Sequence, residues 1–236
     1  MRTIRSVAAT LVMLAASTTS HAGSLPASAK TIGVLPLLPT SGHLFQVALL
    51  RFNNACKPFD LKGANLEATA YSAAAAALGP RYKAVRLTAP AGAEIHTRNT
   101  EVMGAFKSFP TIAAQIRQMA HPPQSVDAYL LVWGRAKNSE CLDIPQPYGF
   151  GLTKVGSNVA AVHTYAEMIL IDAHTEEELG TANMRGATAP LAGFDWKDKD
   201  KPAEVSTEQA QQIRSAMQKV FGAAVAADVR TLAPAQ

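Results

Sequence analysis

Histidine and glutamate side chains in the second half of the chain have the chemistry of a metal site. His163 and His174 carry imidazoles, and three glutamates follow at 176–178. Imidazole nitrogens and carboxylate oxygens are common zinc ligands. His163 falls within a predicted strand and His174 in the turn after it, further apart than one coordination shell reaches unless the chain folds back. We therefore favour a solvent-exposed acidic turn with a surface histidine, and we predict no metal site.

Cys56 and Cys141 are the two cysteines of the sequence. Cys141 could act as a nucleophile with a distant histidine, but an isolated pair in an exported chain is most simply a disulfide. We predict a Cys56–Cys141 bridge, with two free buried thiols as the alternative. The bridge would close a loop of about 85 residues, worth at most about 4 to 5 kcal/mol in the chain-entropy model. The absence of a CxxC spacing disfavours a thioredoxin-type redox site.

Other patterns typical of catalysis or cofactor binding do not occur in the sequence. There is no Gly-x-Ser-x-Gly nucleophile elbow and no Gly-x-x-x-x-Gly-Lys phosphate loop. The segment Gly149-Phe150-Gly151 lacks the third glycine and the following helix of a dinucleotide cradle. No two carboxylates are spaced so that they would share one face. We therefore predict no catalytic residue and no cofactor, and we favour a protein that is not an enzyme.

Aromatic residues in two predicted loops suit contact with a protein partner. Tyr148 and Phe150 lie among prolines in the segment PQPYGF, and Trp196 lies in a charged loop. Exposed aromatic side chains often anchor protein partners. We predict a partner surface at Tyr148, Phe150 and Trp196. The alternatives are a 145–150 loop that packs over a sheet edge and a tryptophan that folds back onto the core.

Two long connections, 88–107 and 135–151, support a rival prediction. Structureless loops of this length are uncommon in a compact domain and are often functional. A deep pocket that joins them and is lined by His96, Glu140 or Asp143 would indicate a hydrolase or a small-ligand-binding protein. A shallow surface at the same place would count against it.

The first 22 residues indicate where the protein works. Arg2 and Arg5 precede an apolar run at 7–16, and a polar stretch ends at Ala22. This is the layout of a secretory signal peptide, and the run is shorter than the roughly 20 apolar residues of a membrane span. We predict cleavage between Ala22 and Gly23, a periplasmic or secreted protein, and no stable membrane insertion. Because Gly23 is not a cysteine, we expect no lipid anchor.

The remaining composition is that of a globular domain. Removing 22 of the 236 residues leaves 214, which suits a single domain. We predict a flexible arm at 23–30 and a folded core at 31–233. Hydrophobic residues make up 48% and charged residues 17%, which argues against global disorder. The net charge of +4 falls to +2 when the two signal-peptide arginines are removed. Because no basic run occurs, we do not expect a nucleic-acid partner.

Strands and helices alternate along the predicted core. Apolar runs predict strands at 31–38, 44–52, 82–87, 127–134, 152–155, 159–172 and 178–186. The first two suit a hairpin, with a short amphipathic helix as the alternative at 44–52. Pro36 indicates an edge position or a short strand for the first. Helices are predicted at 65–78, after Ser108, and from the capping box at 206–209 to about 233. This order predicts an α/β (α+β) sandwich, with one mixed sheet of about five to seven strands and about three helices packed on it.

Three of these segments resemble the curli-secretion-lipoprotein-like envelope domains. Asp127–Gly134 is similar to their "dyllvGtv" strand, Thr31–Leu38 to their opening strand, and Val162–Gly180 to the hairpin that follows. The N-terminal domain of the periplasmic Tol–Pal protein shares this architecture. Two positions depart from the pattern: Glu176 replaces a turn glycine, and no lipidated cysteine follows the cleavage site.

The resemblance implies a non-catalytic domain that works through protein contacts, with no active-site residues to carry over. Together with the signal peptide, it predicts a soluble periplasmic accessory factor that binds another envelope protein. The alternative is a periplasmic hydrolase or small-ligand-binding protein whose site lies in loops 88–107 and 135–151.

Overall fold

The computed structural model describes ten stretches of the chain: 25–47, 55–96, 100–102, 105–107, 109–134, 149–155, 159–184, 187–191, 194 and 205–234. The predicted signal peptide lies outside the described residues. Within the described part of the chain, none of the helices combines the length and the apolar character that a membrane span needs.

The first sheet has five strands in the order β11-β10-β7-β1-β4. Their bounds are Thr31–Leu37 for β1, Lys83–Arg86 for β4, Ala128–Trp133 for β7, Glu167–Asp172 for β10 and Glu178–Asn183 for β11. Strand β1 runs parallel to both of its neighbours, β4 and β7, whereas β10 is antiparallel to β7 and β11. The central position of β7 agrees with its continuous apolar sequence.

The second sheet has five strands in the order β12-β9-β8-β2-β3. Their bounds are Ser41–Val47 for β2, Ala55–Asp60 for β3, Phe150–Val155 for β8, Val159–Thr164 for β9 and Ala187–Leu191 for β12. Strands β5 (Thr100–Val102) and β6 (Ala105–Lys107) form a separate two-stranded ribbon.

The predicted single sheet is therefore corrected to two sheets. The chain leaves one sheet for the other at 38–40, between β1 and β2, and again at Tyr165 and Ala166. The Tyr165 amide donates to the Gly149 carbonyl at 2.8 Å, and the Ala166 carbonyl accepts from Met184 at 2.9 Å. The apolar run 159–172 is thus two strands, β9 and β10, which belong to different sheets.

Two pairing predictions also need correction. Strand β2 pairs with β3 and β8, so it does not form a hairpin with β1. Strand β3 is not among the strands predicted from the sequence, because its sequence ACKPFD has no apolar alternation. The predicted pairing of the last two strands is confirmed by the antiparallel register of β10 and β11, and β12 follows them.

Three α-helices are described, and their ends follow capping chemistry. Helix α1 spans Leu66–Leu78 and ends at Gly79, whose φ of 63° suits a residue without a Cβ atom. Helix α3 spans Thr207–Leu232 and begins with the predicted capping box of Ser206 and Gln209. Helix α2 spans Ile112–Ala120, and its N-cap is Thr111 rather than the predicted Ser108.

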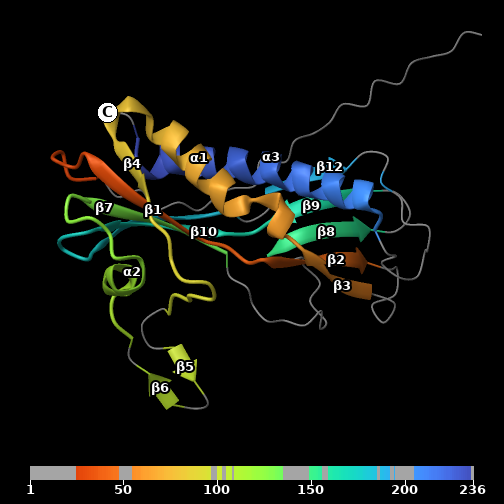
Figure 1. Cartoon of the computed structure of the whole chain (residues 1–236), viewed down its shortest axis with the longest axis horizontal. Helices are drawn as coiled ribbons and strands as arrows, with labels where there is room; N and C mark the ends of the chain where they lie inside the picture. Colours follow the sequence, from red (N-terminus) through yellow and green to blue (C-terminus); the bar gives the residue numbers. More distant parts are fainter. Residues whose placement is uncertain are drawn as a thin grey trace, which may run out of the picture.

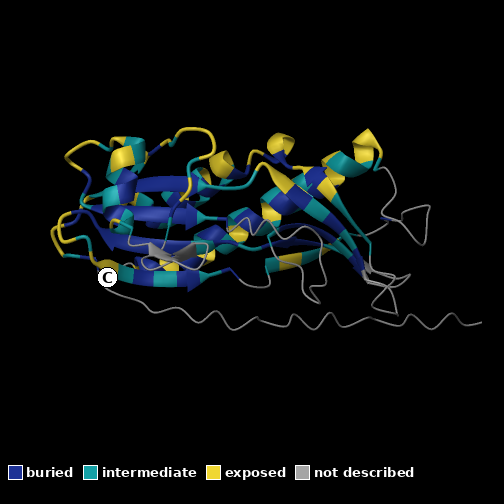
Figure 2. Ribbon diagram, turned by 90° about the horizontal axis from the view of Figure 1, so that it is seen from below, coloured by how far each residue is buried: buried dark blue, intermediate teal, exposed yellow. Residues whose placement is uncertain are grey.

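Helices α1 and α3 lie along the same side of the sheets, whereas α2 covers the opposite side of the first sheet (Figure 1). The buried side of α3 repeats every three or four residues along Ile213, Met217, Phe221, Val225, Val229 and Leu232. This stripe and α1 form the main core with both sheets, while α2 closes a second core that includes Leu35, Ile116 and Leu131. Figure 2 shows exposed residues on the outer sides of the helices and buried residues along the strands.

Candidate functional site

The parallel part of the first sheet creates the conditions for a binding crevice. From β1 the chain reaches β4 through α1 on one face of the sheet, and from β4 it reaches β7 through α2 on the other face. The segments that leave β1 and β4 therefore diverge at the carboxyl ends of these neighbouring strands. In open α/β sheets such a point of divergence is where ligands bind.

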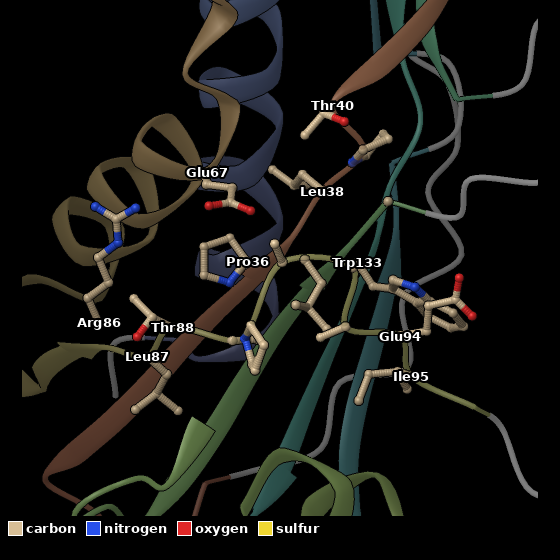
Figure 3. Close-up of a pocket in the computed structure, with 18 residues that line it drawn as sticks. Pro36, Leu38, Thr40, Glu67, Arg86, Leu87, Thr88, Glu94, Ile95 and Trp133 are labelled. Carbon is tan, nitrogen blue, oxygen red and sulfur yellow. The ribbon is translucent and has the colours of Figure 1, made fainter. Parts of the chain in front are cut away.

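A cleft of about 730 Å³ lies at this place. It is lined by residues 36–40 after β1, residues 86–95 at and after the end of β4, residues 133–134 at the end of β7, and Glu67 of α1 (Figure 3). The lining is rich in proline, alanine and leucine, so most of its surface can exclude water from an apolar ligand. The location expected from topology and the cleft found in the structure coincide.

Pro36 lines this cleft and lies on a central strand of seven residues, rather than on the predicted edge strand or short strand. The carbonyls of Thr31 and Leu37 accept from the β7 side, whereas the carbonyl of Val34 accepts from Leu87 on the β4 side. The backbone groups of even-numbered residues in β1 therefore point toward β4. Pro36 lies beyond the last residue that β4 pairs with. Its missing N–H thus removes no bond to β4, which is how a central strand tolerates it.

Among the described residues, the ionisable side chains that line the cleft are those of Glu67, Arg86 and Glu94. The Arg86 guanidinium lies 5.8 Å from the centre of the Tyr71 ring on α1, a distance typical of cation–π contact. Figure 3 shows Glu67 and Arg86 on one side of the cleft, and Glu94 and Trp133 on the other. Both carboxylates are exposed and Trp133 is half-buried. The cleft thus combines an aromatic ring with two carboxylates and one guanidinium.

The loop 88–107 contributes to the cleft only in part, since residues 88–95 line it and His96 does not. The His96 ring stacks on Phe109 with 4.4 Å between ring centres. Its backbone N–H donates to Gln115 Oε1 at 2.9 Å, and its carbonyl accepts from Gln115 Nε2 at 2.8 Å. These contacts fasten the loop to α2. Glu140 and Asp143 lie outside the described residues.

Phe150 does not belong to an exposed partner surface, which corrects the prediction for this residue. Its side chain is 1% exposed, and its ring meets Phe221 of α3 edge-to-face, with 5.2 Å between the centres. The reason is register: Phe150 opens β8 on the same face as Leu152, the face that α3 covers. Tyr148 and Trp196 lie outside the described residues, so their assignment to a partner surface stays a prediction.

The two histidines considered for a metal site are not brought together. His163 is buried in β9 of the second sheet, which corrects the surface position favoured for a histidine here. His174 is exposed in the turn between β10 and β11, where its Nε2 lies 3.8 Å from Asp127 Oδ1. Among the residues that the structure describes, no three histidine, cysteine, aspartate or glutamate side chains gather as a metal site.

Cys56 lies on the edge strand β3, opposite Phe45 of β2. Cys141 lies outside the described residues, so the bridge between them stays a prediction.

Sequence reasoning missed Glu67, Glu94 and Trp133 as lining residues. The available signal was positional rather than chemical. The turn-forming residues after the strands at 31–38 and 82–87 mark strand ends, and parallel neighbours bring such ends to one edge of the sheet. Using this signal required knowing that β1 and β4 are adjacent.

No protein-family model matches the chain, and no curated protein matches it significantly. Among solved structures, it is similar to a single-residue variant of the PelC dodecamer from Paraburkholderia phytofirmans, with 12% identity, a TM-score of 0.37, and coverage of 93% of this chain and 99% of that one. A second PelC dodecamer structure from the same organism gives 12% identity, a TM-score of 0.33, and coverage of 88% and 96%. Likeness at these TM-scores carries no argument about function.

Proposed function

We propose that this chain is an exported, non-catalytic binding protein of the cell envelope, and that the cleft holds an extended segment of a protein partner. The observation that carries the proposal is the cleft of about 730 Å³ where the segments leaving β1 and β4 diverge. Its apolar lining provides the contact area that a peptide main chain and small side chains require.

The charges of the cleft indicate the character of the segment. Glu67 and Glu94 outnumber Arg86, whose guanidinium contacts the Tyr71 ring. Two carboxylates favour lysine or arginine in the ligand, and the Trp133 ring offers a further surface for a cation or a proline. We therefore propose a basic, proline-containing segment as the preferred ligand.

Binding is favoured over hydrolysis because of the types of side chain that line the cleft. The described lining contains no histidine, cysteine or serine, so it lacks the usual nucleophile and base of an acyl-transfer site. A small cationic ligand is the second candidate, since a Trp133 ring and nearby carboxylates would also suit an organic ammonium ion.

Fluorescence anisotropy with labelled peptides tests the proposal. We expect basic, proline-containing peptides to bind more tightly than acidic peptides of the same length. Trp133→Ala and Glu94→Gln should each weaken binding at least about tenfold, as expected for anchor residues. Glu208→Gln provides the matched control, because Glu208 is an exposed carboxylate in the first turn of α3 and does not line the cleft.

Binding that is unchanged in both cleft variants would contradict the proposed site. Saturation of the cleft by a small amine, with no binding of any peptide, would favour the second candidate. The export step has a separate test: mass spectrometry of the protein recovered from the periplasm or medium should find Gly23 at its N-terminus.

A further inference from the structure

A glycine separates two histidines in one row of the second sheet. His43 of β2 pairs with Gly151 of β8, and Gly151 pairs with His163 of β9. Directly paired residues point to the same face of a sheet. The two imidazoles therefore lie on one face, and the strand between them contributes no side chain to the space that separates them.

The His163 ring leans over Gly151. A Cβ atom at position 151 would lie 2.9 Å from His163 Cε1 and 3.1 Å from His163 Nε2, and only 2.1 Å from the His43 carbonyl oxygen. Any side chain there would displace the ring or the backbone of β2. The glycine is thus required for this geometry, in which Nε2 of His163 lies above the middle strand.

The other ring nitrogen of His163 is already engaged. Its Nδ1 lies 3.2 Å from the Thr153 hydroxyl oxygen, two residues further along β8. In the tautomer in which Nδ1–H donates to this oxygen, Nε2 keeps its lone pair, which is how proteins orient many metal-binding histidines. Burial, with a contribution from His43, lowers the pKa of His163 to about 4, and burial also lowers the pKa of His43. Neutral imidazole is the form that binds metal ions.

We infer that His43 and His163 form a two-imidazole notch over Gly151 that binds one Cu²⁺ or Zn²⁺ ion. Imidazole nitrogen suits both ions, and Cu²⁺ binds such sites more tightly than Zn²⁺. Because the described residues provide no third ligand nearby, water or a partner group completes the coordination. His43 is only partly buried, which leaves a route for the ion from solvent.

Titration of the purified mature protein with Cu²⁺ or Zn²⁺ alone tests the inference. We expect one ion per chain by isothermal titration calorimetry, with Cu²⁺ bound more tightly than Zn²⁺. The electron paramagnetic resonance spectrum of the Cu²⁺ form should show coupling to two imidazole nitrogens. His43→Ala and His163→Gln should each weaken binding at least about tenfold.

His174→Gln is the matched control, since His174 is exposed and lies on the first sheet, outside this row. Because His163 is buried, His163→Gln could fail to fold; the partly exposed His43 provides the second variant, with circular dichroism as the check on folding. The inference is overturned if the protein binds no ion, or if binding persists in a folded His43→Ala variant.

Discussion

The Glu176 carboxylate contacts the Arg117 guanidinium, although Glu176 adopts a left-handed backbone conformation with a φ of 65°. The same carboxylate accepts a hydrogen bond from Thr111, the residue that caps α2. This turn position usually favours glycine. The glutamate is accommodated here because its side chain joins the β10–β11 turn to α2. The backbone strain of this residue is offset by contacts between two elements.

Substitutions of Glu176 separate the cost of its left-handed backbone conformation from the stabilisation by its side-chain contacts. Glu176→Ala keeps the unfavourable φ and loses both side-chain contacts, so it should lower the free energy of unfolding by about 1 kcal/mol, given that the ion pair is partly exposed. Glu176→Gly loses the same contacts but relieves the strain, and should be about 1 kcal/mol more stable than the alanine variant. Urea denaturation measures both. Equal stability of the two variants would show that the left-handed conformation carries no cost.

Asp127 joins the beginning of β1 to the beginning of β7. Its Oδ2 accepts the backbone N–H groups of Lys30 and Thr31, each at 2.8 Å. These bonds are the largest cause of its lowered pKa. A carboxyl whose folded-state pKa is lowered stabilises the fold above its unfolded value of about 3.9, and this contribution is lost as the pH falls below that value.

Asp127→Ala should therefore lower stability at pH 7 by about 2 kcal/mol, the scale of a hydrogen bond to a charged group. Asp127→Asn keeps an acceptor oxygen and should lose less, while it removes this contribution to acid unfolding. Thermal melts between pH 7 and pH 3 compare the variants. An alanine variant as stable as the parent would contradict the assigned role.

The contribution of Asp228 to stability depends on pH in the opposite direction to that of Asp127. Asp228 lies on the buried side of α3, and desolvation raises its pKa to about 6. Among the described residues, its Oδ2 has no hydrogen-bond partner. The folded state therefore holds this proton more tightly than the unfolded chain. Its unfavourable contribution is largest above pH 6 and disappears as the pH falls toward 4.

We expect Asp228→Asn to raise stability at pH 8 by about 1 to 3 kcal/mol and to remove this part of the pH profile. Chemical denaturation at pH 8, 6 and 4 measures the effect. Glu208→Gln, a change at an exposed carboxylate of the same helix, should leave the profile unchanged. If the free energy of unfolding of Asp228→Asn changed with pH in the same way as that of the parent, the role assigned to Asp228 would be contradicted.

Phe150 provides a test of the corrected partner surface. Because its ring is buried against Phe221, Phe150→Ala should lower the free energy of unfolding by about 3 to 5 kcal/mol. Tyr148→Ala changes the neighbouring aromatic residue of the same sequence segment and serves as the comparison. Loss of partner binding in a Phe150→Ala variant of unchanged stability would restore Phe150 to the partner surface.

The predicted disulfide is tested by thiol titration. The mature protein, denatured without a reducing agent, should contain no reactive thiol if Cys56 and Cys141 are bridged. Two reactive thiols would refute the bridge. Because a bridge would constrain the unfolded chain, reduction should lower the free energy of unfolding, by at most about 4 to 5 kcal/mol. Urea denaturation of the oxidised and reduced protein measures this difference.

Local chemistry allowed several elements to be predicted from the sequence. The capping box at 206–209 defines the start of the last helix by hydrogen bonding, which does not depend on distant residues. The apolar run of β7 likewise indicated a central strand. These features depend only on neighbours in the chain.

The division into two sheets could not be predicted in the same way. The run 159–172 is apolar on both sides of Tyr165 and Ala166, so its hydrophobic pattern does not reveal that β9 and β10 belong to different sheets. The cleft could not be predicted from local sequence either. Arg86 and Trp133 are distant in sequence and line one cleft only because β4 and β7 both pair with β1.

Helix α3 affects how the protein unfolds. Its 26 residues, about 39 Å of helix, contact β8, β9 and β12 of the second sheet and β11 of the first, as well as α1. Removal of α3 would therefore expose residues of both sheets. We therefore expect a single cooperative unfolding transition, with amide hydrogens of both sheets exchanging at a common slow rate although the chain divides its strands between two separate sheets.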